Sequence, residues 1–300
     1  MTLVERAIEK LRRAAAEKEA AAPARPVGAV VTHIETGGNE PPAGVNPRRI
    51  EIDRASLREA GYLPESSRDR QFADHYRQIK RPLVAKALAA VENGRPSPRV
   101  IMMASALPGD GKTFTSINLA LSLARERDVS VVLVDADVPK PHVSRIFGVD
   151  KEPGLLDALG DPQVDVESLL LTTDIGSLSI LPAGTANEGA TELLASARMQ
   201  TIVGRLLARN SRRIVLFDSP PLLVSSESRA LANVAGQTVL VVRSGTTPKQ
   251  AVLDALEVLE DCENVALVLN QGRAALTTGY YAYGEHRPYG NSGDAEPKQE

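Results

Sequence analysis

Apolar residues gather into short continuous runs between residues 100 and 270, and amphipathic segments lie between these runs. Runs rich in Val, Ile and Leu without alternation are typical of strands that are covered on both faces of a sheet. Alternation of the two types predicts a parallel, doubly wound α/β domain over residues 96–275. The predicted strands are residues 100–104, 129–135, 178–182, 214–218, 238–243 and 265–270, and the predicted helices are residues 113–127, 188–208, 226–235 and 247–262.

The chain before this domain has a different pattern. Residues 1–22 predict one amphipathic helix, whose apolar stripe either docks on a partner or folds back on the core. Residues 23–50 are rich in Pro and Gly and predict a flexible linker. Residues 51–95 predict a helical extension, in which Pro82 is expected to kink or restart a helix.

A glycine-rich turn joins the first predicted strand of the domain to its first helix. It reads A-L-P-G-D-G-K-T from Ala106, which replaces the usual first glycine, to Thr113. Backbone N–H groups of such a turn and the following helix N-terminus can surround nucleotide phosphates. In this loop Lys112 would reach the β- and γ-phosphates, and the Thr113 hydroxyl would ligate Mg²⁺. The candidate nucleotide-binding residues are Pro108, Gly109, Asp110, Gly111, Lys112, Thr113 and Phe114, together with Asn270 at the end of the last predicted strand.

Three aspartates close two further apolar strands. Asp135 and Asp137 follow one predicted strand, and Asp218 ends another. Ligands of open α/β sheets bind at the carboxyl ends of strands, and Mg²⁺ prefers hard oxygen ligands. We therefore expect a metal site made by Thr113 and the three aspartates. The alternative is that each aspartate only caps the turn or helix that follows it.

Composition narrows the classes of function. Hydrophobic residues make up 43% of the 300 residues but aromatic residues only 3%, so the core must be aliphatic. The formal net charge of −3 and the scattered basic pairs give no reason to expect nucleic-acid binding. One cysteine, Cys262, suits a reducing cytoplasm. No apolar run approaches the ~20 residues that span a bilayer, so we expect a cytoplasmic protein that a partner recruits to the inner membrane.

The C-terminal segment, residues 276–300, is unusual in its tyrosines. Four of the six tyrosines of the chain lie in it among glycines, where too few apolar residues exist to build a core. The segment is either an aromatic tail that packs on a neighbouring surface or a flexible arm that presents phosphoacceptor hydroxyls. Behind an ATP site, the second interpretation is favoured. The candidate phosphoacceptors are Tyr280, Tyr281, Tyr283 and Tyr289.

These motifs resemble those of the bacterial tyrosine kinases, whose catalytic domain is a P-loop NTPase of the deviant-Walker, MinD/ParA-like superfamily. The resemblance covers roughly residues 65–290. It rests on the phosphate loop, on D-A-D-V-P-K-P, F-D-S-P-P and L-P-A-G-T, and on the tyrosine tail. The opening helix and the segment D-H-Y-R-Q-I-K-R-P-L are similar to the branch linked to exosortase-associated exopolysaccharide clusters, in which the kinase is a separate soluble chain.

The resemblance implies an ATP- and Mg²⁺-dependent protein-tyrosine autokinase that regulates exopolysaccharide biosynthesis or export. Lys112 and Thr113 would bind the phosphates and Mg²⁺, and Asp137 and Asp218 would support the metal through water. Asp135 would orient or deprotonate the incoming tyrosine hydroxyl.

The resemblance also implies partners. It predicts a ring or dimer of identical subunits that contact one another through a basic helix, here Arg77, Lys80 and Arg81. It predicts activation by a polysaccharide co-polymerase, a chain-length determinant protein of the inner membrane. Pro139 stands where many members have arginine, so no phosphate contact is expected from that position.

Two other functions remain open. The first is a dimerising ATPase switch of the MinD/ParA type, but those proteins carry a lysine where this chain has Leu107. The second is a regulator that binds ATP without catalysis in order to dock on a membrane partner. The three aspartates and the tyrosine tail favour a kinase over both.

Overall fold

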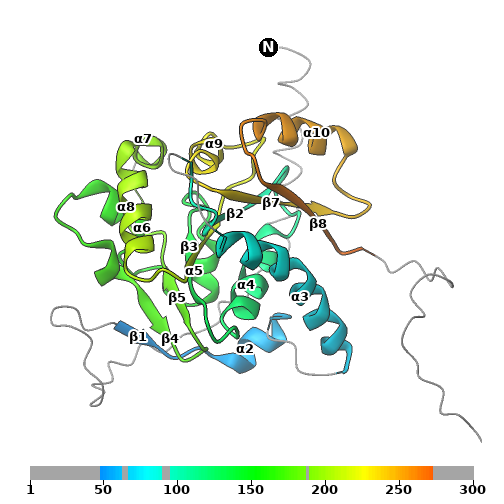
Figure 1. The fold of residues 1–300 in the computed structure, drawn as a ribbon, viewed down its shortest axis with the longest axis horizontal. Helices are drawn as coiled ribbons and strands as arrows, with labels where there is room; N and C mark the ends of the chain where they lie inside the picture. Colours follow the sequence, from blue (N-terminus) through cyan, green and yellow to red (C-terminus); the bar gives the residue numbers. More distant parts are fainter. Residues whose placement is uncertain (1–47, 63–66, 90–94, 187–188, 273–300) are drawn as a thin grey trace, which may run out of the picture.

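A computed structural model of the protein describes residues 48–62, 67–89, 95–186 and 189–272, and these form one mixed sheet between two layers of helices (Figure 1). The strand order is β1-β4-β5-β3-β6-β2-β7-β8. All neighbouring strands are parallel except β4 and β5, which are antiparallel. The strands are β1 Arg48–Ile50, β2 Val100–Ser105, β3 Ser130–Asp135, β4 Leu171–Thr173, β5 Leu178–Leu181, β6 Arg213–Asp218, β7 Gln237–Arg243 and β8 Val265–Asn270.

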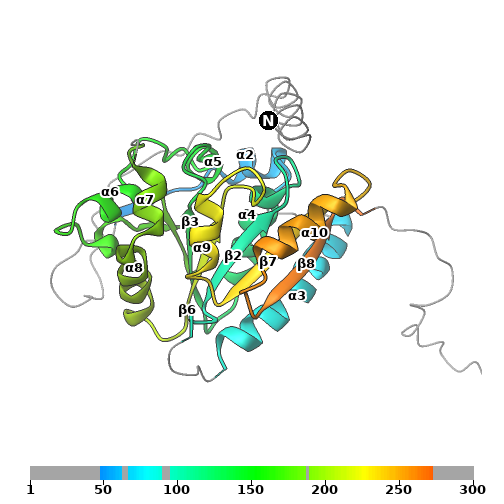
Figure 2. The same cartoon turned by 90° about the horizontal axis from the view of Figure 1, so that it is seen from above.

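The helices lie on both faces of the sheet (Figure 2). Helices α2 to α5 pack on one face, and α6 to α10 pack on the other. They are α2 Arg54–Glu59, α3 Ser67–Ala87, α4 Lys112–Leu123, α5 His142–Ile146, α6 Leu155–Gly160, α7 Ala190–Ala195, α8 Ala197–Ala208, α9 Glu227–Ala232 and α10 Lys249–Val258, with a 3-10 turn, η1, at Val166–Leu169.

Each face of the sheet carries a hydrophobic core, and the central strands contribute alternate side chains to the two cores. In β2, Val100, Met102 and Ala104 face the helices of the α6 to α10 layer, whereas Ile101 and Met103 face the α2 to α5 layer. Successive side chains of a strand point to opposite faces, so a strand covered on both sides must be apolar at every position. This arrangement explains the continuous apolar runs of the sequence.

The six predicted strands are confirmed to within one residue at either end. Strands β1 and β4 were not predicted, and the pairing of Arg48–Ile50 with β4 corrects the predicted linker, which cannot extend to residue 50. The single helix predicted over residues 188–208 is also wrong in detail. It is two helices, because Ser196 adopts an extended backbone between α7 and α8.

The helical extension is present as α2 and α3, but α3 continues through Pro82 instead of restarting there. Leu83 and Ala87 are buried after the proline, and their packing keeps the helix in register against the sheet and α4. The predicted N-terminal helix, the linker before residue 48 and the tyrosine tail lie outside the described residues. None of the helices in the described ranges has the length and apolar content needed to cross a membrane.

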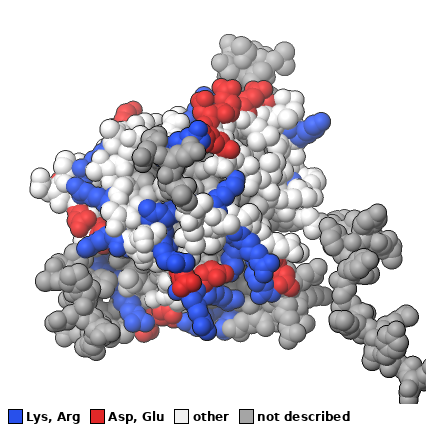
Figure 3. Space-filling view, viewed as in Figure 1, with Lys and Arg blue, Asp and Glu red and all other residues white. Residues whose placement is uncertain are grey.

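Charged side chains of both signs are interspersed on the face shown in Figure 3. Several basic side chains pair with acidic ones, as in Arg54 with Asp174, Arg77 with Asp74 and Arg95 with Glu263. Such exposed pairs contribute little to stability, about 0–1 kcal/mol each.

Candidate functional site

The turn between β2 and α4 has the backbone of a phosphate loop. Gly109 and Gly111 both have positive φ, +84° and +91°, a region that residues with a side chain rarely adopt. Gly111 is the residue before the first turn of α4, and Lys112 opens the helix. The backbone N–H groups at this helix end have no partner within the helix, so they can bind an anion.

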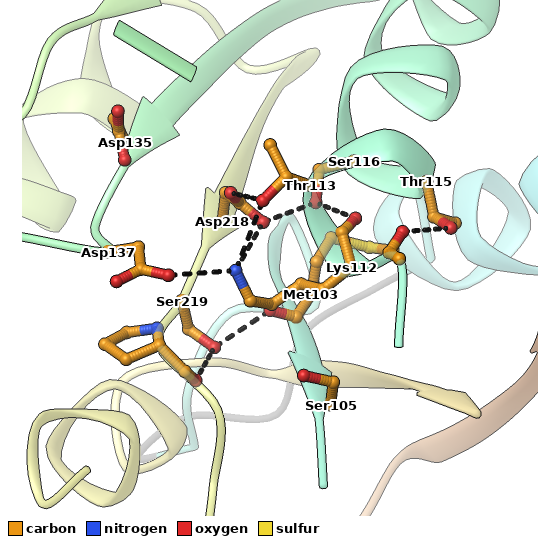
Figure 4. A network of polar contacts seen from close by, with 12 residues as sticks. Met103, Ser105, Lys112, Thr113, Thr115, Ser116, Asp135, Asp137, Asp218 and Ser219 are labelled. Carbon is orange, nitrogen blue, oxygen red and sulfur yellow. Dashed lines mark hydrogen bonds and ion pairs between the residues drawn. The ribbon is translucent and has the colours of Figure 1, made fainter. Parts of the chain in front are cut away.

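The Lys112 side chain lies between two of the predicted aspartates (Figure 4). Its Nζ is 3.3 Å from Asp137 Oδ2 and 3.3 Å from Asp218 Oδ1, although only 6% of the residue is exposed. Burial acts to lower the pKa of Lys112, but the carboxylates of Asp218 and Asp137 outweigh it and raise this pKa overall. Burial raises the pKa of Asp137, against the opposing effect of Lys112. The lysine is therefore a buried cation held by carboxylates from β6 and from the loop after β3.

Asp218 is the centre of this network. It accepts a hydrogen bond of 2.7 Å from Thr113 Oγ1 on Oδ2 and one of 2.8 Å from Ser116 Oγ on Oδ1, in addition to its contact with Lys112. Sequence reasoning missed Ser116. The residue lies three positions after Thr113 on the same helix, a spacing that places two side chains on one face, and this signal was available in the sequence.

Asp135 lies apart from the Lys112 network (Figure 4). It is fully buried, and its Oδ2 accepts hydrogen bonds of 2.7 Å from both the backbone N and the Oγ of Ser144. In the sheet it pairs in register with Asp218 of β6. Burial, and then the charge of Asp218, raise the pKa of Asp135 to about 7. The structure thus brings Lys112, Thr113, Asp137 and Asp218 into direct contact but leaves Asp135 beside them without a hydrogen bond to any of the four.

The phosphate loop is tied to the ends of β7 and β8. Asp110 accepts hydrogen bonds from Leu107 N at 3.0 Å and from Thr247 Oγ1 at 2.7 Å, and its carbonyl accepts one from Asn270 Nδ2 at 2.9 Å. Burial raises the pKa of Asp110, and the bonds from Thr247 and Leu107 oppose this effect. Sequence analysis did not identify Thr247, and no local pattern marks it. Asn270, a predicted nucleotide contact, here supports the loop.

The other predicted loop residues lie at the edge of the site. Pro108 is partly exposed and Gly109 is exposed. The Phe114 ring packs instead on the helical extension, 5.2 Å from the ring centre of Tyr62 and 6.0 Å from that of Phe72. Any nucleotide contact at Phe114 would therefore involve its backbone rather than its ring.

The basic residues of α3 do not form one exposed surface. Arg77 and Arg81 are exposed, but Lys80 is buried. Its Nζ donates to the Ser122 carbonyl at 3.0 Å and contacts Glu126 Oε1 at 2.6 Å. The expectation that all three make subunit contacts is therefore wrong for Lys80, whose role is to hold α3 against the end of α4.

The residues present fit a nucleotide with Mg²⁺. A buried cation, a helix N-terminus and two positive-φ glycines provide for phosphate. The Thr113 hydroxyl and the carboxylates of Asp137 and Asp218 provide hard oxygen ligands beside it. In the described ranges, no three carboxylate, imidazole or thiol side chains are placed to hold a metal ion together. Mg²⁺ keeps several waters and takes phosphate oxygens as ligands, so it does not require such a group.

Comparison with known proteins gives consistent results. A family model described as an AAA domain matches residues 98–266. The tyrosine-protein kinase YwqD of Bacillus subtilis is 32% identical over 186 residues, which are 61% of this chain and 77% of YwqD. The tyrosine-protein kinase wzc of Salmonella typhimurium is 30% identical over 189 residues, 62% of this chain but only 25% of that longer protein. The solved BceF tyrosine kinase domain superposes with a TM-score of 0.57 at 29% identity and covers 71% of this chain and 86% of its own.

Proposed function

The chain belongs to the bacterial tyrosine-protein kinases, and from that membership we propose that it uses Mg²⁺-ATP to phosphorylate tyrosines in its own C-terminal segment. The observation that carries the proposal is the contact of Lys112 with Asp137 and Asp218 at the carboxyl ends of adjacent strands. This is where a transferring phosphoryl group and its metal need one cation and several oxygen ligands.

Each residue of the site has a role in the proposed reaction. Lys112 and the N–H groups of the loop would bind the phosphates, and Thr113, Asp137 and Asp218 would hold Mg²⁺ directly or through water. The metal, when bound, neutralises charge on the phosphates. The tyrosine oxygen forms the new bond to the γ-phosphorus, and the bond from that phosphorus to the β–γ bridging oxygen breaks, so ADP leaves. The hydroxyl proton passes to Asp135, whose raised pKa suits a proton acceptor near neutral pH.

Transfer between subunits is the second part of the proposal. Strand β8 ends at Asn270, beside the phosphate loop, and the first candidate acceptor is Tyr280. Only nine residues lie between the two, which leaves little chain for a tyrosine to turn back into its own site. An identical neighbouring subunit could receive the same segment without that constraint.

The experiment mixes two variants of the chain, one without catalytic activity and one without acceptor tyrosines. One is a Lys112→Met chain with its tail intact, and the other is an active chain truncated after Gly279, which has lost all four candidate acceptors. Phosphotyrosine is then mapped by mass spectrometry. Transfer between subunits predicts phosphate on the Lys112→Met chain. If that chain stays unlabelled while the full-length protein labels itself, the reaction occurs within one subunit.

The proposal extends to regulation. A membrane-bound polysaccharide co-polymerase would recruit and activate the kinase, and phosphorylation would control exopolysaccharide production. Each phosphate adds about −1.5 to −2 charges at pH 7. Modification of four tyrosines in a segment that also holds Glu285, Asp294, Glu296 and Glu300 would repel the tail from the carboxylate-lined site of a neighbour. Assembly and release of a homo-oligomer would then alternate with phosphorylation.

A further inference from the structure

Ser144 holds Asp135 in one orientation by two hydrogen bonds to the same carboxylate oxygen. Its Oγ donates to Asp135 Oδ2 at 2.7 Å, and its backbone N donates to the same oxygen at 2.7 Å. The Ser144 Oγ in turn accepts a hydrogen bond from Ala183 N at 3.1 Å, just after β5. Since Ala183 N can only donate, the hydroxyl proton of Ser144 is directed at Asp135.

The other oxygen of Asp135 is in a different situation. Oδ1 is buried and accepts no hydrogen bond from any described residue. A buried polar atom without a partner is uncommon in folded proteins and destabilises them, so it needs an explanation. The neighbouring strand presents Asp218 at the same level of the sheet, in the centre of the proposed active site. The bonds from Ser144 therefore occupy Oδ2 and leave Oδ1 as the only oxygen of Asp135 that can receive a proton from a ligand.

We propose that Ser144 is a positioning residue for phosphoryl transfer, which fixes Asp135 so that Oδ1 is presented to the hydroxyl of the acceptor tyrosine. This inference rests on the proposed kinase function. Ser144 does not touch the reacting atoms and acts only through Asp135. Loss of its hydroxyl leaves the backbone N–H as one donor, around which the carboxylate can turn. The tyrosine then meets a correctly placed oxygen less often, whereas binding of the nucleotide by Lys112 and the loop is unaffected.

The test compares Ser144→Ala with a matched control, Thr173→Val, in the full-length protein. Thr173 is also buried, and its hydroxyl also accepts from a backbone N, that of Ile175 at 3.1 Å, and donates to a backbone carbonyl, that of Leu178 at 3.0 Å. It lies in β4, which strand β5 separates from β3 and its Asp135. The measurements are kcat and KM for phosphorylation of a Lys112→Met acceptor chain, the Kd of a fluorescent ADP analogue, and the midpoint of thermal unfolding.

A general base contributes about 10²–10⁴-fold to a rate, so partial misplacement of Asp135 should lower kcat about tenfold or more. The KM for ATP and the Kd of the ADP analogue should stay within about twofold of the wild type. Thr173→Val should leave kcat unchanged. Ser144→Cys, which replaces the hydroxyl with a somewhat larger thiol that donates weakly, should have a kcat between those of the wild type and Ser144→Ala. It provides the comparison if Ser144→Ala does not fold.

A double-mutant cycle makes the test specific to Asp135. In an Asp135→Asn background the proton acceptor is already absent, so the further change Ser144→Ala should alter kcat by less than about twofold. The inference is wrong if Ser144→Ala has the wild-type kcat, or if it weakens ADP binding as much as it lowers kcat. It is also wrong if its effect persists undiminished beside Asp135→Asn. Absence of phosphotyrosine in the wild type would instead contradict the proposed function itself.

Discussion

The tether between the phosphate loop and β8 can be tested by the change Gly111→Ala. A Cβ atom built on Gly111 would lie 2.0 Å from Asn270 Nδ2, which is far inside van der Waals contact. The asparagine would have to move, and its 2.9 Å hydrogen bond to the Asp110 carbonyl would break. The positive φ of +91° adds backbone strain, because an alanine disfavours this region.

Gly109→Ala is the matched control for this prediction. Gly109 has a similar φ of +84°, but a Cβ there meets nothing within 4 Å. The control should therefore cost only the strain, about 1–2 kcal/mol of the free energy of unfolding. Gly111→Ala should cost about 1.5–3.5 kcal/mol, since the broken hydrogen bond contributes about 0.5–1.5 kcal/mol more.

The assay is urea unfolding of the nucleotide-free protein, because bound nucleotide would stabilise the native state by mass action. Asn270→Ala removes the atoms that collide, so in that background Gly111→Ala should cost no more than Gly109→Ala does. Equal destabilisation by the two glycine substitutions in the wild type would show that no collision with Asn270 occurs. An unchanged cost of Gly111→Ala beside Asn270→Ala would show the same.

Three further predictions concern a buried acid, a helix and the tail. Burial raises the pKa of Asp110, so the native state binds its proton more tightly than the unfolded state. Urea unfolding at pH values from about 4 upward should show the wild type losing stability relative to Asp110→Asn as the pH rises through the raised pKa, and parallel curves would contradict this. Pro82→Ala should raise the free energy of unfolding by about 1–3 kcal/mol, because α3 continues through this position and alanine supplies the backbone N–H that proline lacks. A lower free energy of unfolding would show that the helix needs the proline. Replacement of Tyr280, Tyr281, Tyr283 and Tyr289 by Phe should preserve ATP binding but abolish any ATP-dependent change in the molar mass of the oligomer. If light scattering gives the wild-type oligomer the same molar mass before and after phosphorylation, charge-driven release is wrong.

The central sheet could be predicted because its strands are buried on both faces, which imposes an unbroken apolar run on each. The two strands that were missed lack this signature. Both β1 and β4 are three residues long, and in Arg48–Ile50 only Ile50 is buried. Among the described residues, strand β1 pairs only with β4, more than a hundred residues further along the chain, and no local pattern indicates such a pairing. Strand β4 also pairs with the nearby β5, but its three residues are too few to show a pattern of their own.

The site was predictable to a similar extent. Lys112, Thr113 and Asp218 follow from the loop and the strand ends, because parallel strands place their carboxyl ends together. Ser144 and Thr247 could not be predicted. Each acts by donating hydrogen bonds to an aspartate of another segment, and a serine on the five-residue helix α5 shows no periodic pattern. The sequence also did not distinguish Asp135 from Asp137. They are two positions apart, yet Ser144 donates a hydrogen bond to Asp135 and Lys112 contacts Asp137.

The proposed kinase activity of the Lys112 site is tested most directly by the phosphotyrosine content of the full-length protein after incubation with Mg²⁺ and ATP. This content is compared with that of Lys112→Met. The substitution removes the cation that lies between Asp137 and Asp218. We expect phosphate on the C-terminal tyrosines of the wild type and a loss of at least about a hundredfold in the variant, because charge stabilisation of the transition state is removed. Equal phosphotyrosine in the two proteins, or none in a wild type that binds ATP, would contradict the assignment of this site as the kinase centre.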